Sequence, residues 1–273
     1  MIKYLLLIAA MMFTGVSFAE GLTEADFITI SPKNDRANAR LGSRLADLMR
    51  HRIQRDSSVQ EVDRLQDIYD VSMRINQDLK SRYSTEEGRP VSVFYLMEDR
   101  GIVLPEPRLR GRDFSLESVV PPSLRGANFE RISTNTTTQN PFYLWNMWVV
   151  YTNTATVALE MFEEGQLTCT EDDIKKMLSI IELVVYSIAF VEAIKEADTE
   201  YYYDNYIKFI NFFKWQLERS LDIYSKVKDT PEFKSEEINA FHQNFLTSSD
   251  AEPMRRSLRR LFGAEWAQRV MGF

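Results

Sequence analysis

The chain has 273 residues, of which 44% are hydrophobic, so it is long enough for one large domain or two modest ones and apolar enough to form a core. Its formal net charge of −7 repels phosphate backbones, which makes nucleic acid a poor candidate partner. Cys169 is the single cysteine, so no internal disulfide can stabilise the fold, and packing must do so.

Residues 1–19 have the pattern of a secretory signal peptide. Lys3 precedes an uncharged apolar run from Leu5 to Phe13. Ser17 and Ala19 are the small residues that signal peptidase requires before its cleavage point. We therefore expect cleavage after Ala19, a mature chain that begins at Glu20, and a periplasmic or extracellular location.

Residues 20–85 form the predicted N-terminal helical segment. Apolar residues recur at helical spacing from Asp35 to about Arg55 and again from Val59 to Leu79. Asp56-Ser57-Ser58 separates the two runs with a fresh N-cap, and Glu87-Gly88-Arg89-Pro90 ends the second. The pattern predicts two amphipathic helices whose apolar sides need a partner surface.

Residues 86–141 form a predicted irregular connector, since six of the nine prolines lie between Pro90 and Pro141. Residues 91–104 are rich in β-branched and aromatic side chains and favour a small β-hairpin that turns at Asp99-Arg100-Gly101. A short helix that begins at Pro90 is the alternative.

The connector contains nearly the same octet twice, as PRLRGRDF at 107–114 and PSLRGANF at 122–129. We expect Gly111 and Gly126 to form turns with positive φ, and the Leu and Phe of each copy to anchor the connector on a helical surface with the arginines outward. Two hooks that hold the connector down are the favoured interpretation. The alternatives are chance similarity or two equivalent docking sites for a partner. The docking sites would use Arg110, Phe114, Arg125 and Phe129.

Residues 132–141 are polar and are expected to form a loop. They include Asn135-Thr136-Thr137, which fits a glycosylation sequon. The sequon has a meaning only in a eukaryotic host, which the sequence does not identify.

Residues 142–273 are expected to form a helical bundle. Helical runs are predicted at 142–162, 170–197, 199–228, 235–246 and 252–271. The chain as a whole is therefore predicted to be mainly α, a helical bundle with an irregular proline-rich middle segment.

Residues 177–194 are apolar enough to resemble a membrane span. Glu182 and Glu192 lie within this stretch, and an ionised carboxylate near the bilayer centre costs about 2.5 kcal/mol or more. We favour a core helix that touches water along one edge, with a membrane-embedded hairpin over 142–194 as the alternative. The expected wet edge consists of Lys175, Ser179, Glu182, Tyr186, Ala189, Ala193 and Glu196.

The sequence contains no motif that identifies a catalytic class. The two histidines, His51 and His242, lie in different segments and lack metal-ligand spacing. Four carboxylates recur at four-residue steps and would form a ladder for a hard cation on one continuous helix. They are Glu192, Glu196, Glu200 and Asp204. The favoured interpretation is a solvated acidic edge, so we predict neither a metal nor a cofactor.

Residues 201–215 hold eight aromatic side chains in fifteen positions. Aromatic stripes at helical spacing usually belong to a core, but this density could also line a groove for a sugar or lipid. Tyr201 and Trp215 fit the apolar face least well, so they are the predicted ligand-binding residues.

Residues 252–271 form a predicted basic amphipathic helix. Such a helix can enter a partner's groove or lie on an anionic membrane as a peripheral contact. It can also cap its own bundle while its arginines pair with acidic neighbours. The arginines are Arg255, Arg256, Arg259 and Arg260.

Together these patterns favour an exported, non-enzymatic helical protein that acts through protein–protein contacts. Its partners would be other proteins, as in an envelope or surface assembly, or a second copy of itself. The alternative is a small-molecule binder or hydrolase, for a sugar or a lipid, with its cleft between the aromatic helix 201–215 and the middle segment.

Overall fold

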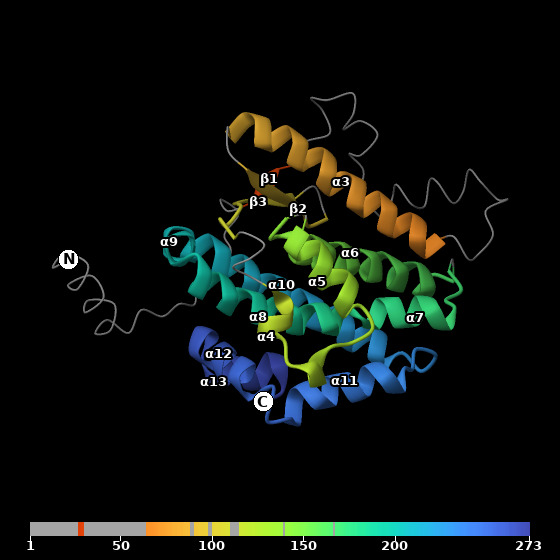
Figure 1. The fold of residues 1–273 in the computed structure, drawn as a ribbon. Coiled ribbons are helices and arrows are strands. Elements are labelled where there is room, and N and C mark those ends of the chain that lie inside the picture. Colours follow the sequence, from red (N-terminus) through yellow and green to blue (C-terminus); the bar gives the residue numbers. More distant parts are fainter. Residues whose placement is uncertain are drawn as a thin grey trace.

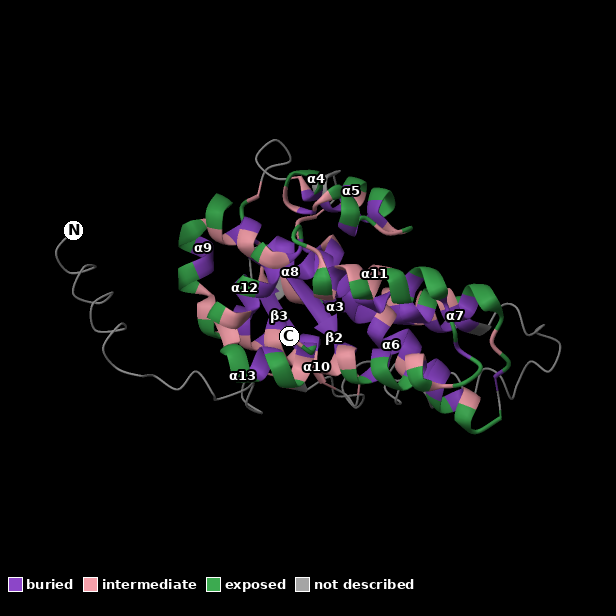
Figure 2. Ribbon diagram, turned by 90° about the horizontal axis from the view of Figure 1, so that it is seen from below, coloured by how far each residue is buried: buried purple, intermediate pink, exposed green. Residues whose placement is uncertain are grey.

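Helix α8, Ile180–Ala197, lies at the centre of the fold (Figure 1). The computed structural model describes residues 27–29, 64–87, 90–97, 100–109, 115–138, 140–165 and 167–273. Fourteen of the 18 residues of α8 are buried, because other helices pack around it (Figure 2). Its packing neighbours include α4 (Leu116–Val119), α6 (Tyr143–Glu163), α10 (Tyr206–Asp229), α11 (Glu236–Thr247) and α12 (Glu252–Phe262).

The central apolar segment is a core helix, as predicted. Residues Glu171–Ala197 are long and apolar enough to cross a membrane by length and composition, but 94% of the apolar window is buried inside the protein. Ile181 and Val185 are fully buried, and Ile188 is 1% exposed. The predicted single helix over 170–197 is divided at Ser179 into α7 (Glu171–Leu178) and α8. A capping box between Thr170 and Asp173 begins α7.

The N-terminal layer combines one long helix with a small antiparallel sheet. Helix α3 (Arg64–Glu87) packs on β2 (Val91–Tyr95) and on α6. Strand β2 pairs with β3 (Arg100–Pro105) in a register that places Val93 opposite Val103, and β1 (Ile28–Thr29) pairs with the other edge of β3. The mainly α fold and the small hairpin are confirmed. The predicted helical run over 35–55 lies outside the described residues.

The hairpin turns earlier than predicted. Arg100 and Gly101 lie in β3, not in the turn. Met97 adopts φ 71°, and its carbonyl accepts the N–H of Arg100 at 3.0 Å. Gly101 was the expected turn residue, but it pairs with Tyr95 within the hairpin. Met97 has the positive φ at the turn instead.

The connector contains a helix where a loop was expected. After α4 and a short 3-10 turn, η5 (Pro122–Leu124), helix α5 covers Phe129–Thr138. The Thr136 hydroxyl donates to the Ile132 carbonyl, and the Asn135 side chain donates to the Arg131 carbonyl. Phe129, Ile132 and Thr136 are buried, so packing overrides the poor intrinsic helix propensity of this polar segment.

The connector also covers the face of α8 that was expected to touch water. Glu182 is 1% exposed and Tyr186 is fully buried. The Gly126 N–H donates to the Tyr186 hydroxyl at 2.8 Å, and the Asn128 N–H donates to the Glu182 carboxylate at 3.1 Å. The polar seam of α8 therefore binds the connector of the same chain. The prediction that this edge touches water is wrong at Glu182 and Tyr186.

Gly126 has a different role from the one predicted. Its φ is not positive, so it does not form a left-handed turn. Its Cα instead lies against Glu182, where an added Cβ would stand 2.6 Å from one carboxylate oxygen and 2.7 Å from the other. Glycine is needed for close approach. Gly111, in the first copy of the octet, lies outside the described residues.

The chain closes with shorter helices than predicted. The run over 199–228 is divided at Asn205 into α9 (Thr199–Asp204) and α10. The run over 252–271 becomes α12, a short α13 (Ala264–Trp266) and the π-helical turn η6 (Ala267–Met271), because Gly263 adopts φ 90°. The predicted run over 235–246 corresponds to α11.

Candidate functional site

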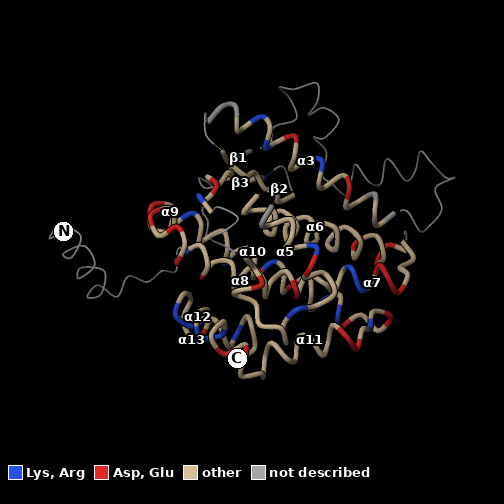
Figure 3. The backbone as a smooth tube through the Cα atoms, viewed as in Figure 1, with Lys and Arg blue, Asp and Glu red and all other residues tan. Residues whose placement is uncertain are grey.

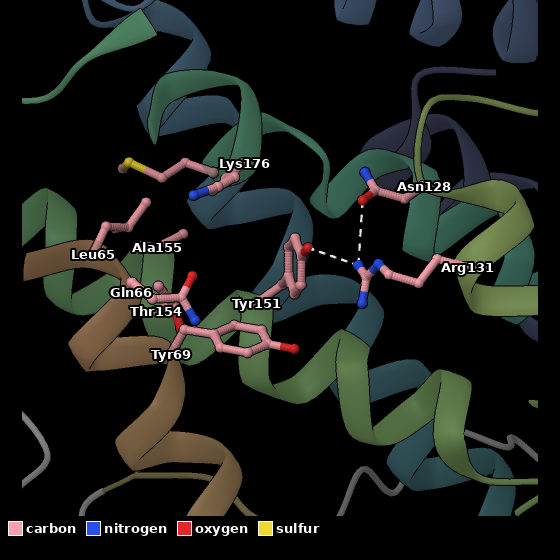
Figure 4. Close-up of a pocket in the computed structure, with 10 residues that line it drawn as sticks. Leu65, Gln66, Tyr69, Asn128, Arg131, Tyr151, Thr154, Ala155 and Lys176 are labelled. Carbon is pink, nitrogen blue, oxygen red and sulfur yellow. Dashed lines mark hydrogen bonds between the residues drawn. The ribbon is translucent and has the colours of Figure 1, made fainter. Parts of the chain in front are cut away.

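A groove of about 360 Å³ lies between α3, α5, α6 and α7 (Figure 4). Helical spacing explains the α6 wall, since Tyr151, Thr154 and Ala155 are three and four residues apart and share one face. Tyr69 comes from α3 and Lys176 from α7, whereas Asn128 and Arg131 come from the docked connector. The groove therefore exists only because the connector lies on the bundle.

Arg131 is the main charged group of this groove. Its Nη2 donates to the Tyr151 hydroxyl at 3.0 Å and to Oδ1 of Asn128 at 3.3 Å (Figure 4). In the part of the chain that the structure describes, no carboxylate lies within ion-pair distance of Arg131 or Lys176. Two positive charges thus face the groove without a negative partner.

The phenols around Arg131 are neutral at physiological pH. Burial raises the pKa of Tyr69 to about 12 and also raises the pKa of Tyr151. Burial alone would lower the pKa of Arg131, but the nearby phenols outweigh that effect and raise it. The guanidinium therefore stays charged while the tyrosines act as neutral donors and acceptors.

The floor of the groove is apolar with one unsatisfied hydroxyl. Leu65, Ala155 and Met177 are buried and line it. Thr154 is 6% exposed, and its hydroxyl has no hydrogen-bond partner among the described residues. A ligand with an apolar body could cover this floor while an acceptor group pairs with the hydroxyl.

Asn128 connects the groove to the buried carboxylate of Glu182. The Asn128 backbone N–H donates to Glu182, and its side-chain Oδ1 accepts from Arg131. Burial raises the pKa of Glu182, although hydrogen bonds from Asn128 and Tyr186 oppose the change. Glu182 does not line the groove, but Asn128 connects it to Arg131 through hydrogen bonds.

The predicted partner-binding residues of the second octet contact their own chain. Phe129 is 5% exposed and packs edge-to-face against Tyr186. Arg125 is exposed, but its guanidinium donates to the carbonyls of Glu117 and Val120 and covers the Phe129 ring. The second copy thus has the geometry of a hook. Arg110 and Phe114 lie outside the described residues.

Most of the predicted arginines of the C-terminal helix cap their own bundle. Arg255 is 6% exposed and donates to the carbonyls of Phe245 and Ser248 at the end of α11. Arg259 pairs with Glu252 at 3.3 Å, and Arg260 lies 3.9 Å from Glu192. Arg256 remains exposed. These contacts fit the alternative interpretation of residues 252–271, in which the helix caps its own bundle.

The predicted ligand-binding pair does not come together. Tyr201 was expected to be exposed but is 7% exposed, because its ring packs between Phe142 and Phe209. Trp215 is half-buried beneath Arg219 and beside Phe27. Tyr201 lines a different groove, between the middle segment and α9, and Trp215 is not among the residues described there.

The carboxylate ladder is interrupted and the remaining reactive groups are dispersed. Asp198, at φ −134° and ψ 67°, ends α8, so the four acids do not share one continuous helix. No cluster that could hold a metal ion occurs among the described residues. Burial lowers the pKa of His242 and raises the pKa of the half-buried Cys169 thiol to about 11. His51 lies outside the described residues.

Sequence reasoning missed the residues of the groove between α3, α5, α6 and α7. Arg131 directly precedes the segment 132–141, which was expected to be a loop, so its place on a helix was not anticipated. Tyr69 and Tyr151 sit on predicted helices, but the sequence does not show that their helices meet. Comparison of the chain with protein-family models, curated proteins and solved structures finds no match.

Proposed function

We propose that this protein is a non-enzymatic binding protein whose ligand is a small organic anion, a carboxylate or phosphate ester with an apolar or aromatic body. The observation that carries the proposal is the guanidinium of Arg131. It faces a groove with an apolar floor and has neutral hydrogen-bond partners, with no carboxylate beside it among the described residues.

The geometry favours an anion for three physical reasons. Arg131 donates to Tyr151 and Asn128 through Nη2 and also hydrogen-bonds to Tyr69, and a guanidinium has five N–H donors, so donors remain for a carboxylate or phosphate. Lys176 adds a second positive charge from the other side of Tyr151 (Figure 4). A volume of about 360 Å³ also suits a small organic molecule.

Binding is favoured over catalysis by the chemistry of the lining. Among the described residues, the ten that line the groove include no histidine, cysteine or carboxylate. The raised pKa values of Tyr69 and Tyr151 make both phenols poor general bases near neutral pH. These groups are suited to hold a ligand, not to move its protons.

Export remains part of the proposal on the strength of residues 1–19 alone. A mature protein that begins at Glu20 would present the groove to the periplasm or to the exterior. A ligand-binding protein in that place would capture an anion outside the cytoplasm.

Isothermal titration with matched probes tests the proposal. Phenyl phosphate and benzoate should bind, whereas benzamide and benzyl alcohol, which carry the same ring without a charge, should bind at least tenfold more weakly. Arg131→Gln should weaken binding of phenyl phosphate by roughly tenfold to hundredfold, since a hydrogen bond to a charged group contributes about 1.5–3 kcal/mol.

Arg74→Gln provides the matched control, because Arg74 is an exposed arginine of α3 that does not line the groove. It should leave the affinity unchanged. Thermal unfolding of both variants checks that they remain folded. Equal affinity for benzamide and benzoate, or an equal loss in the two variants, would refute the anion proposal.

A further inference from the structure

A second surface, at α9 and the start of α10, exposes two large apolar side chains. Tyr203 is 63% exposed and Ile207 is 73% exposed. They are four residues apart across Asn205, whose backbone at φ −107° and ψ 7° stays close to a helical path. The two side chains are therefore neighbours on the surface, where they form one apolar patch.

A groove of about 670 Å³ lies beside this patch, between the middle segment and α9. Four prolines line it, and a proline has no backbone N–H to donate. They are Pro90, Pro105, Pro107 and Pro141. Tyr201 also lines the groove, and its hydroxyl has no hydrogen-bond partner among the described residues. A polar group of an occupant can pair with this hydroxyl, which both donates and accepts.

The groove is also negatively charged. Four carboxylates line it, of which Glu106 is paired with Lys80 at 2.6 Å, and among the described lining residues Arg108 is the one with a positive charge. The carboxylates are Glu106, Asp198, Glu200 and Asp204. Arg108 is 87% exposed and lies 3.9 Å from Glu200, so this pair is solvated and weak. Acidic residues are concentrated on α9 (Figure 3), next to Tyr203.

We propose that this surface docks a basic segment of a partner protein. Lysine or arginine side chains of the partner enter the acidic proline-walled groove, and an adjacent apolar residue covers Tyr203 and Ile207. Charge complementarity selects a basic partner, while the apolar patch selects a peptide segment over a free amine. The surface is separate from the anion groove, since α9 and α7 lie at opposite ends of the molecule in Figures 1 and 2.

Fluorescence anisotropy with defined probes tests this assignment. The probe is a labelled nine-residue peptide of alternating lysine and leucine, and its counterpart replaces every lysine with glutamate. The full mature chain should bind the lysine peptide, with an affinity that falls as salt rises, and should not bind the glutamate peptide.

Two double variants separate the parts of the surface. Tyr203→Ala with Ile207→Ala should weaken binding at least tenfold, because both side chains lose their apolar contact with the peptide. Glu200→Gln with Asp204→Asn should weaken it about threefold to tenfold and reduce its salt dependence. Glu163→Gln with Glu232→Gln is the charge-matched control on exposed carboxylates elsewhere and should change nothing.

Three results would overturn the proposal. If spermidine, at the same total concentration of positive charge, displaces the labelled peptide as well as unlabelled lysine peptide does, the groove is a site for small cations. An equal loss in the control variant would mean that only the net charge of the protein matters. Dimers in sedimentation that dissociate in the Tyr203→Ala, Ile207→Ala variant would identify the occupant as a second copy of this chain.

Discussion

The contact between Gly126 and Glu182 can be tested by adding a single methyl group. In Gly126→Ala the new Cβ would lie 2.6 and 2.7 Å from the two carboxylate oxygens of Glu182, well inside van der Waals contact. The carboxylate is buried within α8, so the connector must move instead. Overpacking of this kind costs about 1–3 kcal/mol.

A shift of the connector also disturbs the hydrogen bonds beside it. The Asn128 N–H donates to Glu182 at 3.1 Å, and a bond to a charged group contributes about 1.5–3 kcal/mol. We expect a total loss of about 2–4 kcal/mol in the free energy of unfolding. For a domain of this size the loss lowers Tm by roughly 4–16 °C.

A double-mutant cycle in urea isolates the clash. With Glu182→Ala in place, Gly126→Ala meets no carboxylate and should be neutral, or stabilising by about 0.4–1 kcal/mol, because its φ is not positive. Gly263→Ala is the control, since Gly263 has φ 90° with no atom near its missing Cβ. Its cost should not depend on Glu182. If Gly126→Ala costs as much with Ala at 182 as with Glu, the close-approach argument fails.

Three further predictions concern pH and processing. Burial raises the pKa of Glu182 in the folded state above 4.5, so the folded protein holds this proton more tightly than the unfolded chain. As pH rises above 4.5, the wild type should therefore lose stability relative to Glu182→Gln in urea unfolding. Parallel plots of stability against pH for the two proteins would contradict this. Burial lowers the pKa of His242 below 6.5, so the stability of the folded protein should fall as pH decreases through 6.5. His242→Gln should flatten this part of the plot of stability against pH. An unchanged plot would mean that the imidazole is solvated. Intact mass of the protein secreted from its host should correspond to a chain that starts at Glu20, and a product that retains Met1 would disprove cleavage.

The sequence predicts well those parts of the fold that depend on local periodicity. The burial of α8 follows from its unbroken apolar run, and the end of α3 follows from the Gly88-Arg89-Pro90 stop. The capping box that begins α7 could likewise be read from its residue types. Such signals lie within one segment, so no knowledge of neighbouring elements is needed.

Several features that failed depend on contacts between distant segments. Helix α5 forms from threonines and asparagines because Ile132 and Phe129 find a surface to cover. The Arg131 groove requires four elements to meet, and nothing in any one of them indicates the others. Arg255 was expected to meet a partner or to pair with acidic neighbours, yet it also donates to the carbonyls of Phe245 and Ser248 at the end of α11, which its own segment does not indicate.

If residues 1–19 direct export, as proposed above, the burial of α8 sets a condition on that export. Neighbouring helices cover this segment in the folded protein, but an unfolded chain in an export channel would lack that cover. At that stage an apolar stretch competes for sideways release into lipid, and Glu182 and Glu192 oppose that release by about 2.5 kcal/mol or more each. In an exported chain, Glu182 would therefore have two uses, since it would oppose release of this segment into lipid and, after folding, accept a hydrogen bond from the connector.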